Sequence, residues 1–187
     1  MAEQSFLSDH FLIAMPGLKD PNFAHSVTYI CEHTEDGALG LIINRTSNVS
    51  LGELLQHLGD QQAPAAVAAT PVMIGGPVQQ DRGFVLHTPI GKWESSLAVG
   101  SHLGLTTSRD VLLAMARGEG PDKVLVTLGY AGWGAGQLER EMAANAWLAG
   151  PADPTIIFET PVEQRWHAAA ALLGVELSLL ATDPGHA

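Results

Sequence analysis

The chain has little cysteine, few basic residues and no long hydrophobic run. Cys31 is the only cysteine among 187 residues, which excludes an intramolecular disulfide and suits a reducing compartment. No apolar run approaches the roughly 20 residues that a helix needs to cross a bilayer. The first residues, Met1–Ser5, lack the positive start of a signal peptide. These absences predict a cytoplasmic protein that does not enter a membrane.

Positive charge is scarce as well. The chain has 9 basic against 20 acidic residues, a formal net charge of −11, and its basic residues are scattered singly. Nucleic-acid binding normally depends on Lys and Arg that neutralise phosphates, and an acidic chain repels polyanions. These features disfavour direct binding to DNA, and we expect no tight, sequence-specific complex with it.

Apolar runs and turn residues predict an α+β fold. A length of 187 residues fits one domain, spanning 1–187. Asp36-Gly37 between two apolar runs indicates a hairpin. Strands and helices follow one another irregularly, which favours a mostly antiparallel sheet with helices outside it. Strands are predicted at 11–15, 26–33, 39–44, 72–74, 83–87, 97–105 with a break at Gly100, 124–129, 155–159 and 176–180.

Three helix starts carry the same signal, a hydroxyl residue three positions before an acid. The hydroxyl residues are Ser50, Thr107 and Thr160, the last followed by Pro161 at the first helical position. A fourth helix is expected at about 137–148, with Asn145 joining it to a neighbouring loop. The three helices are expected to end at Gly59, Gly118 and Gly174.

The stretch Gly129–Gly136 combines four glycines with Tyr130 and Trp133. Since glycine permits positive φ and close backbone approach, this stretch predicts a loop that is either a tight structural junction or the wall of a binding site. It fails the dinucleotide pattern G-x-G-x-x-G, because Gln137 occupies the third glycine position. Glu139 and Glu141 would also repel a phosphate there.

Residues that could perform chemistry are sparse. Cys31 and His33 lie two apart in a strand, with His25 or His87 as further candidates for a metal or redox site. One cysteine with scattered histidines does not match zinc-ligand spacing, and a buried structural thiol is the simpler interpretation. No G-x-S-x-G nucleophile motif is present. We expect no catalytic residues, no metal and no cofactor.

Several residues at strand ends and in glycine turns are not explained by helix or strand formation. Loops on a rigid scaffold often carry function, so we expect these residues to form one concave patch that binds a ligand or partner. Trp133, as an exposed loop residue, is expected to matter for binding and little for stability. The predicted patch comprises Asn44, Arg45, Gly75, Gly76, Arg82, Tyr130, Gly132 and Trp133.

A set of segments along nearly the whole chain carries a family resemblance: Phe11–Pro16, Ser26–His33, Gly40–Arg45, Gly75–Val78, Arg82–His87, Leu105–Val111, Gly129–Trp133, Gln137–Glu139, Asn145–Trp147 and Gly185–Ala187. In these segments the chain resembles the AlgH/YqgE family of conserved bacterial proteins. The resemblance implies an α+β fold with a bifurcated, partly barrel-like sheet wrapped by helices. The family name comes from a proposed role in regulating alginate production, which implies a transcriptional regulator, and no catalytic residue, cofactor or ligand comes with it.

Two hypotheses about function follow. The first is a non-enzymatic regulatory protein that acts through a protein partner or a small ligand rather than through direct DNA binding. The alternative is a small-molecule-binding protein or hydrolase-like enzyme that uses the Gly129–Gly136 loop with Asn44, Arg45 and Arg82.

Overall fold

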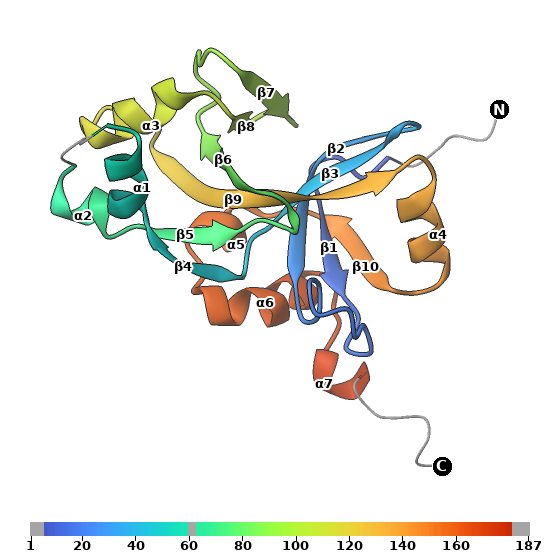
Figure 1. Cartoon of the computed structure of the whole chain (residues 1–187). Coiled ribbons are helices and arrows are strands. Elements are labelled where there is room, and N and C mark those ends of the chain that lie inside the picture. Colours follow the sequence, from blue (N-terminus) through green and yellow to red (C-terminus); the bar gives the residue numbers. More distant parts are fainter. Residues whose placement is uncertain (1–5, 60–62, 181–187) are drawn as a thin grey trace. The chain divides into compact units, whose positions relative to one another are not determined.

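The computed structural model describes residues 6–59 and 63–180 (Figure 1). Met1–Ser5 and the terminal Gly185–Ala187 of the family resemblance lie outside the described residues. The chain divides into two compact units. The terminal unit contains the chain up to Asn44 and from Ala131 onward, and the central unit contains Arg45–Tyr130. The expectation of a single domain stays a prediction.

The terminal unit is an antiparallel sheet with short helices. Its strand order is β10-β1-β2-β3-β9, and only the end of β9 belongs to this unit. Leu12, Ile30 and Trp147 lie in its buried core. The elements are β1 (His10–Ala14), β2 (Val27–Thr34), β3 (Gly37–Ile42), β9 (Lys123–Gly134), α4 (Gln137–Ala143), β10 (Trp147–Pro151), α5 (Pro154–Phe158), a 3₁₀ turn (Val162–Gln164), α6 (Arg165–Leu172) and α7 (Leu177–Leu180).

The central unit also builds a sheet on β9. Its strands follow the order β9-β6-β8-β7, and β5 joins β9 in parallel while pairing with β4. Leu51, Val85 and Val126 lie in a core that helix and strand side chains form together. The elements are β4 (Thr46–Ser50), α1 (Leu51–His57), α2 (Ala65–Ala68), β5 (Pro71–Ile74), β6 (Val78–Thr88), β7 (Ser96–Val99), β8 (Leu103–Thr106) and α3 (Arg109–Ala116).

These elements confirm the α+β class with mostly antiparallel strands. Thr34 pairs with Gly37, so Glu35 and Asp36 form the predicted hairpin turn. The break near Gly100 is also confirmed, because it separates β7 from β8. Two strands, β4 and β10, were not predicted.

The helix starts were predicted in part. The Ser50 hydroxyl accepts the Glu53 N–H at 3.3 Å, so the first start is confirmed. The second helix is capped at Ser108 rather than Thr107, and the Ser108 hydroxyl donates to the Asp110 carboxylate at 2.6 Å. After Pro161 the chain makes the 3₁₀ turn before α6 begins at Arg165. Gly59, Gly118 and Gly174 have positive φ, as expected after helices.

Two predicted strands are helices instead. Residues 155–159 fall mostly in α5, where the Asp153 carboxylate accepts the Thr155 N–H at 3.0 Å and Pro154 stands in the first turn. Of the predicted strand 176–180, residues 177–180 form α7. In α5 the capping signal outweighs the apolar run, because short apolar runs occur in both strands and buried helices.

The fourth helix is shorter than predicted. It ends at Ala143, and Asn145 takes a left-handed conformation with φ 60° before β10. Asn145 is exposed, and its backbone N–H bonds to the Met142 carbonyl. It therefore ends the helix through its backbone rather than joining it to a loop through its side chain.

The predicted loop Gly129–Gly136 is mostly strand. β9 continues to Gly134, because Ala131–Gly134 pair with Gly37–Gly40 of β3. Side chains alternate along it, with Ala131 and Trp133 buried and Gly132 and Gly134 exposed. The loop prediction was wrong because glycines in this strand leave the pairing intact.

Candidate functional site

Closely packed backbone segments meet in the central unit where β5 ends beside β9. We call this region the corner and define it by Gly75, Gly76, Gln79–Arg82, Phe84, Gly129 and Tyr130. Gly75 donates its N–H to the Leu128 carbonyl at 2.8 Å. A Cβ at Gly75 would collide with the Gly129 carbonyl oxygen. Glycine is required here because two backbones touch directly.

Gly129 must also be glycine, both because backbone atoms lie close to it and because its own φ is positive. Its φ is +79°, and a Cβ there would lie 2.5 Å from the Gly76 oxygen and 3.1 Å from the Val78 oxygen. Both neighbours are backbone atoms, which cannot turn aside as a flexible side chain could. The corner is therefore held rigidly by backbone contacts.

The pairing of β6 with β9 is interrupted opposite Gly129. Val78 pairs with Tyr130 and Gly83 pairs with Leu128, so Gln79–Arg82 stand opposite Gly129 alone. All of Gln79–Arg82 are exposed, and Gln79 has φ 48°, a strained value for a residue with a side chain. Bulges of this kind redirect side chains and often lie beside functional sites.

An arginine and two aromatic rings line the corner. The Arg82 guanidinium lies 5.6 Å from the centroid of the Phe84 ring, a cation–π distance. The Phe84 ring meets the Tyr130 ring edge-on at 5.6 Å, and Arg82 also donates to the Gln79 side-chain oxygen at 3.4 Å. Arg82 is exposed, Tyr130 half-buried and Phe84 buried. The Phe84 ring, which the Tyr130 ring contacts, thus orients the exposed Arg82 guanidinium.

The structure brings together part of the predicted patch. Gly75, Gly76, Arg82 and Tyr130 meet at the corner, and the Arg45 carbonyl accepts the Ile74 N–H at 2.7 Å beside them. Gln79 and Phe84, which also belong to the corner, were not predicted. The polar run Gln79–Arg82, directly after Val78, was the available signal for a bulge.

Asn44, Gly132 and Trp133 belong to the terminal unit. The Asn44 amide accepts the Val27 N–H at 2.8 Å and donates to the His25 carbonyl at 2.9 Å, so it anchors the start of β2. Gly132 is an exposed position of β9. A patch that combines these residues with the corner stays a prediction.

Trp133 is a core residue, and its expected exposure was wrong. Its side chain is buried, and its indole N–H donates to the Glu141 carboxylate at 3.1 Å. Trp147 donates to the same oxygen at 3.0 Å. Phe23 lies 6.0 Å from the Trp133 ring and 5.5 Å from the Trp147 ring. Trp133 therefore packs into an aromatic cluster with both its ring and its N–H satisfied.

Comparisons with known proteins agree with this fold. The family model described as AlgH-like matches residues 11–178. The chain belongs to the AlgH-like family. A UPF0301 protein of Thioalkalivibrio sulfidiphilus is 60% identical, and one of Nitrosococcus oceani is 56% identical, each over 100% of both chains.

Two solved structures are similar to this AlgH-like chain. The solution structure of the AlgH protein from Pseudomonas aeruginosa has 54% identity and a TM-score of 0.81, covering 100% of each chain. A crystal structure of a Corynebacterium diphtheriae protein has a TM-score of 0.75 at 20% identity, covering 98% of this chain and 95% of that one. The second likeness concerns the fold alone.

In this AlgH-like chain His33 and His25, two of the candidates for a metal or redox site, make contacts with other side chains. His33 accepts the Leu7 N–H at Nδ1, at 2.9 Å, so its proton is on Nε2, which donates to Glu139 at 2.9 Å. That hydrogen bond is the main reason why the pKa of Glu139 is lowered. His25 stacks on Trp166 at 4.2 Å. Within residues 6–59 and 63–180, no three His, Cys, Asp or Glu side chains are grouped to hold a metal ion.

Cys31 is buried, as predicted, and we expect it to react slowly in the native protein. Desolvation, with a further contribution from Glu32, raises the pKa of the Cys31 thiol, which suppresses the reactive thiolate. Iodoacetamide labelling followed by mass spectrometry should be slow at neutral pH and rapid in urea. Equal rates in both conditions would contradict this assignment.

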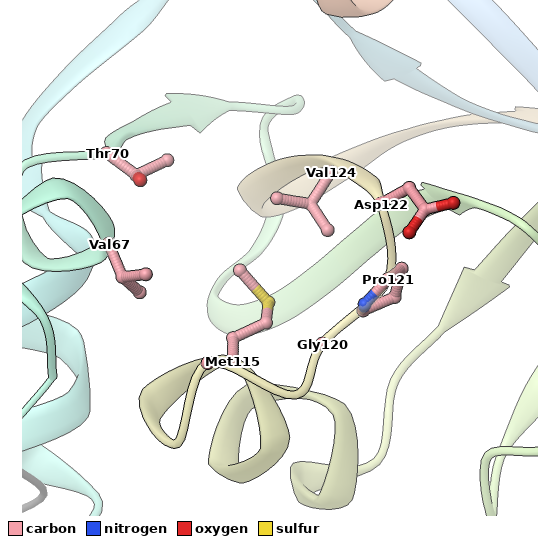
Figure 2. Close-up of a pocket in the computed structure, with 8 residues that line it drawn as sticks. Val67, Thr70, Met115, Gly120, Pro121, Asp122 and Val124 are labelled. Carbon is pink, nitrogen blue, oxygen red and sulfur yellow. The ribbon is translucent and has the colours of Figure 1, made fainter.

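A pocket of about 230 Å³ lies in the central unit (Figure 2). Met115 and Val124 supply apolar surface, while Thr70 and Asp122 supply the polar side chains. Ligand pockets usually measure about 300–1,000 Å³, so this one is small for a cofactor. No residue of the predicted patch lines it.

No helix in the described parts of the chain is both long and apolar enough to cross a membrane.

Proposed function

We propose that this AlgH-like chain is a regulatory protein that acts by binding a partner protein at the corner, rather than by binding DNA directly. The observation that supports this most is Arg82, an exposed guanidinium held over Phe84 beside Tyr130. Arginine and tyrosine are enriched among the residues that dominate binding energy in protein interfaces. The same proposal places the chain in the cytoplasm.

Rigidity favours binding at the corner. Backbone contacts between Gly75, Gly76 and Gly129 fix the base of the bulge that carries Arg82. A surface ordered before association loses less conformational entropy when a partner binds. The exposed glutamines Gln79 and Gln80 add hydrogen-bonding groups around the arginine.

A hydrolase-like or small-molecule site in Gly129–Gly136 is the alternative, and it has less support than the corner. That stretch is mainly β9, and its tryptophan is buried against Glu141. The Gly134 N–H is already satisfied by the Gln137 side chain at 2.9 Å. A partner-binding role at the corner is therefore the function that we put forward.

The proposal predicts no tight, sequence-specific complex with DNA. The net charge of −11 opposes the approach of phosphates. Electrophoretic mobility shifts with genomic fragments, run at about 150 mM salt, should show only weak binding that does not depend on sequence. A nanomolar complex with one defined duplex would contradict the proposal.

Site-specific photo-crosslinking in cells tests the partner-binding role. A photoreactive amino acid at the exposed position Gln80 should give a discrete protein adduct, because Gln80 lies in the bulge beside Arg82. Arg82→Glu should abolish that adduct. The same probe at Glu119, an exposed position after α3, is the control. The same adducts from Gln80 and Glu119, or an adduct from Gln80 that survives Arg82→Glu, would refute the role of the corner.

A further inference from the structure

In the central unit a series of hydrogen bonds leads from a buried imidazole to the hydroxyl of an exposed serine. His87 of β6 is fully buried, and its Nε2 lies 2.7 Å from the Thr106 hydroxyl of β8. The Thr106 hydroxyl lies 2.8 Å from the Ser96 hydroxyl of β7. Ser96 is exposed on the last strand of this unit's sheet order.

One contact determines which group donates and which accepts in each of these hydrogen bonds. His87 Nδ1 lies 2.9 Å from the Pro89 carbonyl oxygen, which can only accept, so Nδ1 carries the ring proton. Nε2 of the neutral ring must then accept from Thr106. Because Thr106 donates its proton to His87, its oxygen accepts the proton of Ser96.

The surroundings keep the imidazole in this orientation and uncharged. Gly104 lies directly across the ladder from His87, and a Cβ there would come within 2.6 Å of the ring. Burial lowers the pKa of His87, so the ring is neutral near pH 7. A neutral, oriented imidazole whose other nitrogen is hydrogen-bonded is the arrangement that activates serine nucleophiles.

We propose that Ser96 is a nucleophile that accepts acyl groups from small activated carboxylic esters, with Thr106 and His87 as a proton relay behind it. This inference is independent of the corner. Water can satisfy the hydrogen bonds of an exposed serine, so Ser96 does not need Thr106 for its stability. The hydrogen bonds to Thr106 and His87 instead give the Ser96 hydroxyl a path along which it can lose its proton. Ser96 is the catalytic residue, and Thr106 and His87 position and deprotonate it.

The reaction balances without any further reactant. The Ser96 Oγ forms a bond with the carbonyl carbon, and the bond from that carbon to the leaving oxygen breaks with its electron pair. The Ser96 proton moves to Thr106 while the Thr106 proton moves to His87 Nε2. As the leaving oxygen departs, the imidazolium returns one proton through Thr106 to that oxygen, which leaves as an alcohol or phenol. The product is O-acyl-Ser96.

Incubation of the full chain with p-nitrophenyl acetate tests the proposal. We expect p-nitrophenolate release with a burst of about one equivalent per chain, and peptide mapping by mass spectrometry should place the acetyl group on Ser96. Ser96→Ala should remove the burst. Ser95→Ala is the matched control, because Ser95 is the adjacent exposed serine and lies outside the relay.

Variants at Thr106 test the relay itself. Thr106→Val keeps the shape but removes the hydroxyl and should slow acylation about 100-fold, while Thr106→Ser should retain it. If circular dichroism shows that Thr106→Val does not fold, the relay is tested in the parent chain instead, by the ratio of acetylation at Ser96 to acetylation at Ser95. A ratio above about 10 supports the relay. No acetyl-Ser96, equal acetylation of both serines, or a folded Thr106→Val variant with the parent rate would overturn it.

Discussion

Trp133→Ala is expected to lower the free energy of unfolding by about 3–5 kcal/mol. The substitution removes a buried indole that contacts Phe23 and Trp147. It also removes one of the two indole N–H groups that hold the Glu141 carboxylate. Urea denaturation followed by circular dichroism measures the change.

Trp133→Phe separates the ring from its hydrogen bond. It keeps most of the aromatic surface but loses the N–H to Glu141, so we expect a cost of about 1–2 kcal/mol. A Trp133→Ala variant as stable as the parent would show that the aromatic cluster does not support the terminal unit. It would also restore the sequence-based expectation that Trp133 is a surface residue.

Gly129→Ala is expected to destabilise the central unit by about 3 kcal/mol or more, through backbone strain at positive φ and overpacking. The added methyl group would meet the Gly76 oxygen at 2.5 Å and the Gln80 Cα at 3.2 Å, both of them backbone atoms. Thermal unfolding monitored by circular dichroism measures the loss.

Gly134→Ala is the matched control for that experiment. Gly134 lies in the same strand, has no positive φ, and the nearest atom to an added Cβ is the Gln137 side-chain oxygen at 3.9 Å. We expect its stability to change by less than about 0.5 kcal/mol. If Gly129→Ala and Gly134→Ala behave alike, the corner is not held by close backbone contacts.

Short sequence motifs predicted the turns and helix starts that depend only on neighbouring residues. The hairpin at Glu35 and Asp36 and the cap at Ser50 each depend on a few adjacent residues. β10 could not be predicted in that way, because Gly150-Pro151 resembles a helix stop. In the structure the Leu173 side chain packs against Gly150, which is a contact distant in sequence.

The candidate site was predicted to a similar degree. Glycines and an arginine at strand ends indicated the corner, and Gly75, Gly76, Arg82 and Tyr130 do meet there. The burial of Trp133 depends on Glu141 and Trp147, so its pairing was not visible in local sequence. The alternation of Ala131, Gly132, Trp133 and Gly134 was nevertheless a period-two signal for a strand.

Binding of the crosslinked partner to purified protein tests the central claim most directly. Isothermal titration calorimetry would compare the parent chain with Arg82→Ala and with Arg117→Ala. Arg117 is the control because it is an exposed arginine of the same unit, paired with Glu119 at 3.2 Å. We predict that Arg82→Ala raises the dissociation constant at least about 30-fold, as expected for a dominant interface residue, while Arg117→Ala leaves it within about twofold. Equal affinities for the parent and Arg82→Ala would contradict the assignment of the corner as the partner-binding surface.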